Sequence, residues 1–163
     1  MPNSFTISDL ALGSGHLGIC PLPGRWGRYS DDIATIRKWR PSLVLSMTTV
    51  DEMAAYGASS LKADLTASSI AWHHLPVRDF GAPEAETIVR WTEISSLAQQ
   101  ALSQGGKVLA HCKGGCGRSG MILLRLMVEM GEAPDDALSR LRTTRPCAVE
   151  TDAQLHWASL PAR

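Results

Sequence analysis

Residues 111–120 read HCKGGCGRSG, and this stretch decides both the fold and the chemistry of the chain. In front of it lies the short apolar run 107–110, which follows a pair of glycines, and after it comes the apolar run 121–130. The pattern predicts a strand, a tight glycine-rich loop and a buried helix in succession. Such a loop can direct several backbone N–H groups toward one point at the positive end of a helix, which makes an anion site.

The loop opens with Cys112 and closes with Arg118, with five residues between them. A cysteine near a helix N-terminus and cationic side chains is favoured as the nucleophilic thiolate. The guanidinium of Arg118 can hold two oxygens of a phosphate, and the hydroxyl of Ser119 can donate to the sulfur. The glycines that allow such a tight turn are Gly114, Gly115 and Gly117. The loop therefore joins a nucleophile to a cradle for a phosphoryl dianion.

This stretch resembles the signature of the cysteine-dependent protein tyrosine phosphatases, which is His-Cys, any five residues, Arg, then Ser or Thr. The resemblance implies that Cys112 is the nucleophile and becomes a phosphocysteine, and that Arg118 binds phosphate and stabilises the transition state. It also implies that Ser119 assists departure of the thiolate and that His111 supports the loop. The phosphate-binding positions that it implies are Lys113, Gly114, Gly115, Cys116, Gly117 and Arg118.

Three other interpretations of the loop fit the sequence less well. A metal site from His111, Cys112 and Cys116 would need a fourth ligand, and the sequence has no matching second pair of Cys or His. A nucleotide-binding loop needs Lys before Ser or Thr, where this chain has Arg118. An inactive phosphatase fold that only binds phosphoproteins is compatible with the fold, but the intact Cys112 and Arg118 argue against it.

The remaining pattern predicts an α/β fold. Strands are expected over 5–12, 43–47, 70–75 and 107–111, and helices over 31–40, 84–104, 121–130, 134–143 and 151–160. This alternation indicates a single domain over residues 1–163, with a largely parallel central sheet flanked by helices. Ligands bind at the carboxyl ends of strands in such sheets, and Cys112 lies at one of these ends.

Residues 13–18 read GSGHLG and formally match a dinucleotide-binding fingerprint. That fingerprint must open a helix, but Pro21 and Pro23 follow at once and prevent one. We therefore expect a turn-rich surface segment. Residues 17–24 also resemble a stretch of the cyclin-dependent-kinase-associated dual-specificity phosphatases.

The best candidate for a general acid is Asp79, in the segment 75–83 that reads LPVRDFGAP. This segment resembles the acid loop of dual-specificity phosphatases, in which a Pro follows the Asp at the spacing of Pro83. The alternative is an Asp that only caps a turn before the next helix. Glu84 and Glu86 are the reserve candidates for the acid.

A third resemblance covers residues 145–154, RPCAVETDAQ, where related phosphatases have Arg-Pro-Gly followed by Thr and Gln. It implies that Gln154 positions the water that hydrolyses the phosphocysteine. Thr151 and Gln154 also match a helix capping box, and both roles can hold together. Cys147 stands in place of the usual Gly.

The four cysteines are irregularly spaced and do not predict a disulfide framework. We expect Cys116 to be a small apolar filler. The alternative is a thiol that traps oxidised Cys112 as a disulfide, with Cys20 and Cys147 as more distant partners.

The formal net charge of +0 gives no reason to expect a nucleic-acid partner. No apolar run reaches the roughly 18 residues of a membrane span, and residues 1–5 lack the pattern of a signal peptide. We expect a cytoplasmic enzyme without cofactor or metal. Its expected substrate is phosphotyrosine on a protein or peptide, with phosphoserine and phosphothreonine as further substrates. The alternative, suggested by Lys113, is a phosphoinositide or another small phosphate ester.

Overall fold

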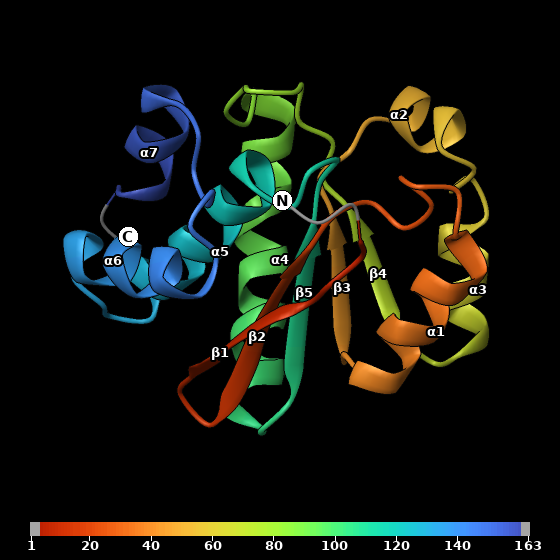
Figure 1. The fold of residues 1–163 in the computed structure, drawn as a ribbon. Helices are drawn as coiled ribbons and strands as arrows, with labels where there is room; N and C mark the ends of the chain where they lie inside the picture. The colour runs from red at the N-terminus through yellow and green to blue at the C-terminus, as the bar shows by residue number, and fades with distance from the viewer. Residues whose placement is uncertain (1–3, 161–163) are drawn as a thin grey trace.

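The computed structural model describes residues 4–160 and contains one five-stranded sheet with the order β1-β2-β5-β3-β4 (Figure 1). The strands are β1 (Ser8–Leu12), β2 (Gly15–Cys20), β3 (Leu43–Ser46), β4 (Ala71–His74) and β5 (Lys107–His111). Strand β1 runs antiparallel to β2, and every other pair of neighbours is parallel. The expected α/β domain with a largely parallel sheet is confirmed.

Helices cover both faces of the sheet, with α1 and α3 on one side and α4, α5 and α6 on the other (Figure 1). Helix α2 lies beyond the carboxyl ends of the strands, and α7 packs against α5. Their bounds are α1 (Tyr29–Trp39), α2 (Val50–Ala55), α3 (Leu61–Ala67), α4 (Ala85–Ser103), α5 (Gly117–Glu129), α6 (Pro134–Thr144) and α7 (Asp152–Ala158). The helices predicted from the sequence are all present within a few residues of their expected ends. No helix in residues 4–160 is long and apolar enough to cross a membrane.

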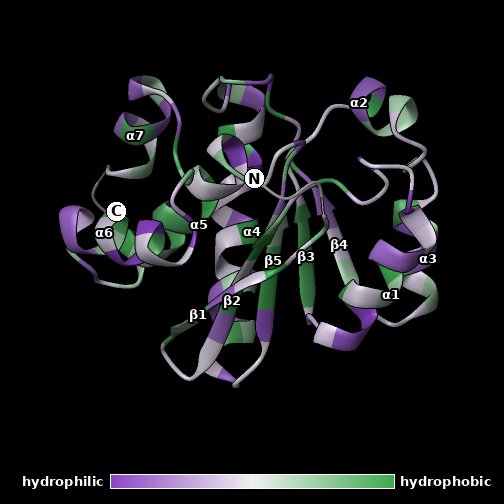
Figure 2. Ribbon diagram, viewed as in Figure 1, coloured by the Kyte–Doolittle hydropathy of each residue, from purple (hydrophilic) through white to green (hydrophobic). Residues whose placement is uncertain are grey.

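Strand β5 is buried on both faces, as its unbroken apolar sequence predicts. Val108 and Ala110 belong to the core formed with α4 to α7, whereas Leu109 belongs to the core formed with α1 and α3. Figure 2 shows the central strands as the most hydrophobic part of the fold. Because β5 is held from both sides, the loop that follows it starts from a fixed point.

The expectation of a turn-rich surface segment at residues 13–18 is wrong, because residues 15–20 form the buried strand β2. Leu17 and Ile19 are fully buried. The glycines serve close packing here: a Cβ on Gly15 would lie 2.3 Å from the carbonyl oxygen of Gly106, and one on Gly18 would lie 2.7 Å from the ring of Trp39. The segment is a strand and opens no helix, so the rejection of the dinucleotide-binding fingerprint is confirmed.

Helices α2 and α3 were not expected from the sequence. Helix α2 has only 6 residues, and it begins with a capping box in which Thr49 and Glu52 bond to each other's backbone N–H. This Thr-x-x-Glu pattern is visible in the sequence, but the segment is too short to show helical periodicity. Its place matters, because it brings Glu52 to the carboxyl end of the sheet.

Candidate active site

The cysteine loop is held between the ends of two neighbouring strands. The N–H of Leu22, just beyond β2, donates to the carbonyl oxygen of Lys113 at 3.2 Å, and the N–H of Met47, just beyond β3, donates to that of His111 at 3.0 Å. Cys112 is only 2% exposed, and its Sγ lies 3.2 Å from Oγ of Ser119. The nucleophile candidate and the hydroxyl expected beside it are therefore in contact.

Arg145 fixes the curl of this loop from behind. Its Nε donates to the carbonyl oxygen of Gly115 at 2.9 Å and its Nη2 to that of Gly114 at 3.4 Å. Gly115 has a φ of 68°, and a Cβ there would lie 2.5 Å from the backbone of Cys20. Because the C=O and the following N–H of a trans peptide point in opposite directions, the N–H groups of Gly115 and Cys116 point away from Arg145.

Arg118 is buried, with 1% exposure, and its orientation is set by Glu52. Nη1 and Nη2 donate to the two carboxylate oxygens of Glu52 at 2.7 and 2.8 Å, and Nη1 also donates to the carbonyl oxygen of Val77 at 2.9 Å. Within residues 4–160, Nε is buried and has no acceptor. The guanidinium is thus held in place with one donor free for a ligand oxygen.

Both partners of this ion pair are charged at neutral pH. Burial alone would raise the pKa of Glu52, but hydrogen bonds from Arg118 and from the backbone of Thr49 lower it to about 2. Burial likewise opposes the charge on Arg118, and the hydrogen bonds to Glu52 outweigh it and raise the pKa of the guanidinium. Glu52 was not predicted from the sequence, because its local signal is the capping box alone.

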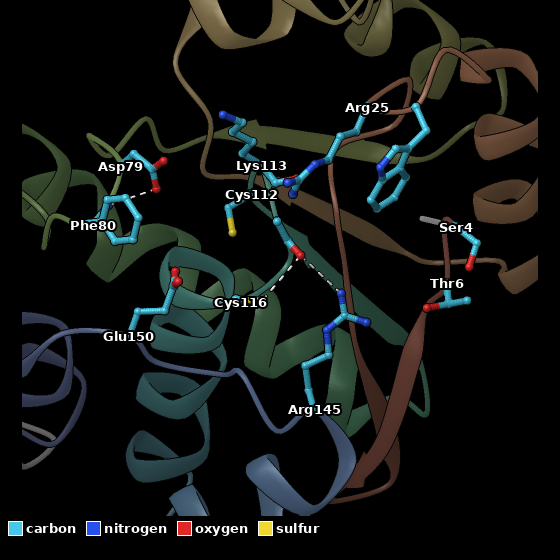
Figure 3. A pocket seen from close by; sticks show the side chains of 12 residues that line it. Ser4, Thr6, Arg25, Asp79, Phe80, Cys112, Lys113, Cys116, Arg145 and Glu150 are labelled. Atoms are coloured by element: carbon cyan, nitrogen blue, oxygen red, sulfur yellow. Dashed lines mark hydrogen bonds between the residues drawn. The ribbon is translucent and has the colours of Figure 1, made fainter. Parts of the chain in front are cut away.

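Asp79 lies across the loop from Cys112. Its Oδ1 accepts from the N–H of Phe80 at 3.0 Å and lies 3.3 Å from Nη2 of Arg118, and its side chain is 42% exposed. Asp79 and Cys112 line one cleft of about 480 Å³ (Figure 3). The reserve acids, Glu84 and Glu86, line a separate cavity that Cys112 does not reach.

Gln154 is fully buried and forms the capping box with Thr151 at the start of α7. Its Oε1 accepts from the N–H groups of Glu150 and Thr151, and its Nε2 donates to the carbonyl oxygen of Gly81 at 3.1 Å. These contacts link the acid loop to α7. Arg145 and Glu150 of the segment 145–154 line the cleft. Glu150 was not predicted from the sequence, and a Cβ on Gly117 would lie 2.2 Å from its Oε1.

His111 supports the loop from beneath. Its Nε2 is hydrogen-bonded to Oγ of Ser46 on β3, and Nε1 of Trp72 donates to the same hydroxyl at 2.7 Å. Burial lowers the pKa of His111 to about 4, so the ring is neutral at pH 7. The network joins β3, β4 and β5 at the edge of the sheet that carries Cys112.

The cysteines differ from both expectations. Cys116 forms a disulfide with Cys147, with a Cα–Cα distance of 5.0 Å, so it is neither a free apolar filler nor bonded to Cys112. Cys112 and Cys20 are free, and burial raises the pKa of the Cys20 thiol. The loop turns Cys116 toward residues 145–148, which lie next to it in space and not in sequence. No group of three or more His, Cys, Asp or Glu side chains in the described part of the chain could hold a metal ion.

Comparison with known proteins agrees with this geometry. Residues 34–132, more than half of the chain, match the family model described as "Polymorphic toxin system, DSP-PTPase phosphatase". The chain is 30% identical over 154 residues to cyclin-dependent kinase inhibitor 3 of Sus scrofa, covering 88% of this chain and 70% of that protein. The Homo sapiens protein of the same name is 28% identical over 165 residues, covering 93% of this chain and 76% of that protein.

Two solved structures extend the comparison. One is kinase associated phosphatase with a serine in place of its catalytic-site cysteine; it has a TM-score of 0.82, 25% identity, and coverage of 97% of this chain and 94% of that one. The other is Tk-PTP in the active form, with a TM-score of 0.71, 26% identity, and coverage of 96% and 95%. Together with the matched family model, these similarities show that the chain belongs to the DSP-PTPase family and is a cysteine-dependent protein tyrosine phosphatase of the dual-specificity type, related to the cyclin-dependent-kinase-associated phosphatases.

Proposed function

We propose that residues 1–163 act as one phosphatase domain that hydrolyses phosphotyrosine on proteins, and also phosphoserine and phosphothreonine, through a phosphocysteine on Cys112. The observation that carries this proposal is that Cys112 and Asp79 line one cleft and that the buried Arg118 contacts Asp79. The Sγ of Cys112 contacts Ser119, Arg118 keeps a free buried donor, and Asp79 lies 3.3 Å from Arg118. This arrangement supplies a nucleophile, a phosphate clamp and an acid.

In the first step, the thiolate of Cys112 attacks phosphorus, so that a P–S bond forms and the P–O bond to the substrate side chain breaks. Nε of Arg118 and the loop N–H groups hold the phosphoryl oxygens, whose charge develops in the transition state. Asp79 donates its proton to the leaving oxygen. A tyrosine, serine or threonine hydroxyl therefore leaves in neutral form.

In the second step, water attacks the phosphocysteine and the P–S bond breaks, with phosphate and the thiolate as products. Ser119 stabilises the departing thiolate from 3.2 Å, and the Asp79 carboxylate accepts a proton from the water. The resemblance implies that Gln154 positions this water, and in this scheme it does so indirectly, because its amide oxygen and nitrogen bond to the backbone of Glu150, Thr151 and Gly81. In this scheme Glu150, which lines the cleft, accepts the second hydrogen bond of the water.

The test is hydrolysis of an aryl phosphate by purified protein in the presence of EDTA. We expect wild type to be active and Cys112→Ser to be inactive, while Cys20→Ala, which removes the other free thiol, keeps most of the activity. Dependence on an added divalent metal would contradict the scheme. An inactive wild type that still bound phosphopeptides would instead support the binding-module alternative.

We further propose a cytoplasmic location, where a nucleophilic thiol stays reduced. The Cys116–Cys147 disulfide departs from this expectation, because disulfides are rare in reducing compartments. Separation of cell fractions followed by immunoblotting tests the location, and recovery of the protein outside the cytosolic fraction would contradict the proposal. Thiol alkylation in intact cells followed by mass spectrometry shows separately whether Cys116 and Cys147 are bonded there.

A further inference from the structure

Two cationic side chains at the rim of the Cys112 cleft have no carboxylate partner in residues 4–160. They are Arg25, whose guanidinium lies over the ring of Trp26 at 5.2 Å, and Lys113, whose Nζ lies over the ring of Tyr56 at 5.6 Å. Both line the cleft, and neither takes part in any of the ion pairs of the described chain. Their charges are therefore uncompensated beside a cleft that must bind an anion.

Arg25 is anchored at the phosphate cradle and does not extend freely into solvent. Its Nη1 donates to the carbonyl oxygen of Lys113 at 3.0 Å, and a Cβ on Gly114 would lie 3.1 Å from the same nitrogen. Lys113 directly follows Cys112 in the chain. In residues 4–160, Nε and Nη2 of Arg25 have no hydrogen-bond acceptor of their own, so the free part of the guanidinium remains available.

The two sides of the cleft carry opposite charge. Asp79 and Glu150 lie on one side of Cys112 and Arg25 lies on the other, and the side chain of Lys113 extends from the loop between them, away from Arg25 (Figure 3). The acidic side faces the leaving group in the proposed reaction. A negatively charged neighbour of the phosphorylated residue would be repelled there and attracted toward Arg25 and Lys113.

We propose that Arg25 forms a second anion subsite, with Lys113 as a further cation at the rim, so that the preferred substrate is a phosphoprotein segment with another anionic group, a carboxylate or a second phosphate, next to the phosphorylated residue. Arg25 bonds to the residue after the nucleophile, and an extended peptide advances about 3.3 Å per residue. The second anion therefore belongs one or two positions from the phosphorylated residue. This inference rests on the proposed function, because it adds a contact to the same site.

The test compares phosphotyrosine peptides that differ at the flanking positions alone: Ala, Asp, phosphoserine or Lys. For wild type we expect kcat/KM to be about five- to tenfold higher with Asp or phosphoserine than with Ala, mostly through KM, since a charge-assisted contact holds the ground state as well. The preference should shrink in about 0.5 M NaCl, which screens a rim contact. Comparison of the Asp peptide with the phosphoserine peptide shows whether the second anion is a carboxylate or a phosphate.

Variants then assign the preference to Arg25. Arg25→Gln keeps an N–H donor for the Lys113 carbonyl but removes the charge, and it should reduce the Asp-to-Ala ratio to about one to two. Arg25→Glu should reverse the order in favour of Lys. Arg28→Gln is the matched control, because Arg28 is an exposed arginine that pairs with Asp31, and it should keep the wild-type ratio. The readout is a ratio within one variant, so a general loss of activity cancels.

The outcomes separate this inference from the proposed function. A wild type that hydrolyses the Ala peptide without preferring Asp or phosphoserine overturns the subsite alone, whereas an inactive wild type overturns the proposed function. The subsite is also overturned if the preference for Asp over Ala persists in Arg25→Gln and fails to reverse in Arg25→Glu. Faster hydrolysis of a soluble inositol polyphosphate than of every peptide, lost in Arg25→Gln, would assign the subsite to a small phosphate ester and overturn the phosphoprotein substrate.

Discussion

The two loops that form the cleft, residues 112–118 with the nucleophile and residues 78–83 with the acid, are built in opposite ways. The nucleophile loop is largely buried, and it is fixed by hydrogen bonds from Arg145 and by the Cys116–Cys147 disulfide. The acid loop is open to solvent, and its tip residue Phe80 is 59% exposed with a φ of 62°. It is held to the helix α7 region by hydrogen bonds from Thr151 and Gln154 to two of its carbonyl oxygens.

This difference matches the two tasks. Groups that stabilise developing charge are effective when they are preorganised, so the phosphate cradle benefits from a rigid support. A loop that brings an acid to the leaving group must also admit a protein substrate and release it. Arg118 connects the two, because it contacts Glu52, the carbonyl oxygen of Val77 and Asp79.

The largest expected effect comes from breaking the rigid loop at this connection. Arg118→Lys replaces a planar fork with a point charge that cannot bond to both Glu52 oxygens and a phosphate. We expect kcat/KM on an aryl phosphate to fall about 10³-fold, by comparison with loss of an oxyanion donor. Circular dichroism checks that the variant folds, and Arg28→Lys is the surface control. A loss below tenfold would contradict the assigned role.

A change in the open loop should have a smaller and substrate-dependent effect. Asp79→Asn should lower kcat for an alkyl phosphate by about 10²-fold and should affect a nitrophenyl phosphate far less, because a poor leaving group alone needs the proton. Glu84→Gln, in a separate cavity, should leave both rates near wild type. Equal losses for the two substrates would give Asp79 a structural role.

Opening the disulfide tests how much of the rigidity is covalent. The bridge spans a sequence separation of 31 residues, for which the chain-entropy model gives about 3–4 kcal/mol of stability. Cys147→Ser should therefore lower the unfolding midpoint by about 10 °C, while Arg145 keeps the loop curled and activity in reductant is retained. Wild type should lose similar stability when reduced. Equal midpoints for oxidised and reduced wild type would contradict this expectation.

The smallest expected effect is the change in the stability of the folded chain with pH, through two groups beside the nucleophile loop. The folded chain holds His111 with a pKa of about 4 and Glu52 with a pKa of about 2, below their ordinary values of about 6.5 and 4.3. As pH falls, the unfolded chain therefore binds protons that the folded chain does not bind. Each group's contribution to the free energy of unfolding is full above its ordinary pKa and is lost as pH falls below it. The urea concentration at the midpoint of unfolding should fall between pH 7 and pH 4. In His111→Gln, the dependence of this midpoint on pH should be weaker above pH 4.5. An unchanged slope in that variant would contradict the assignment.

The sequence by itself determined the strand, loop and helix over residues 107–130, because each signal there is local: an apolar run, glycines at the turn and a motif whose residues are chain neighbours. The Thr151–Gln154 capping box was predictable for the same reason, since its partners are three residues apart. Asp79 stood out in the sequence as a lone carboxylate between a strand and a helix; it lines the Cys112 cleft, and its role as the acid stays a prediction.

Only the tertiary structure decided what surrounds these residues. Glu52 meets Arg118 across 66 residues of sequence, Arg25 meets Lys113 across 88, and Cys116 meets Cys147 across 31. Such partners are set by the strand order β1-β2-β5-β3-β4, which places the ends of β2 and β3 on either side of β5. The strand order cannot be predicted from local sequence, since these side chains become neighbours only after the sheet has brought distant segments together.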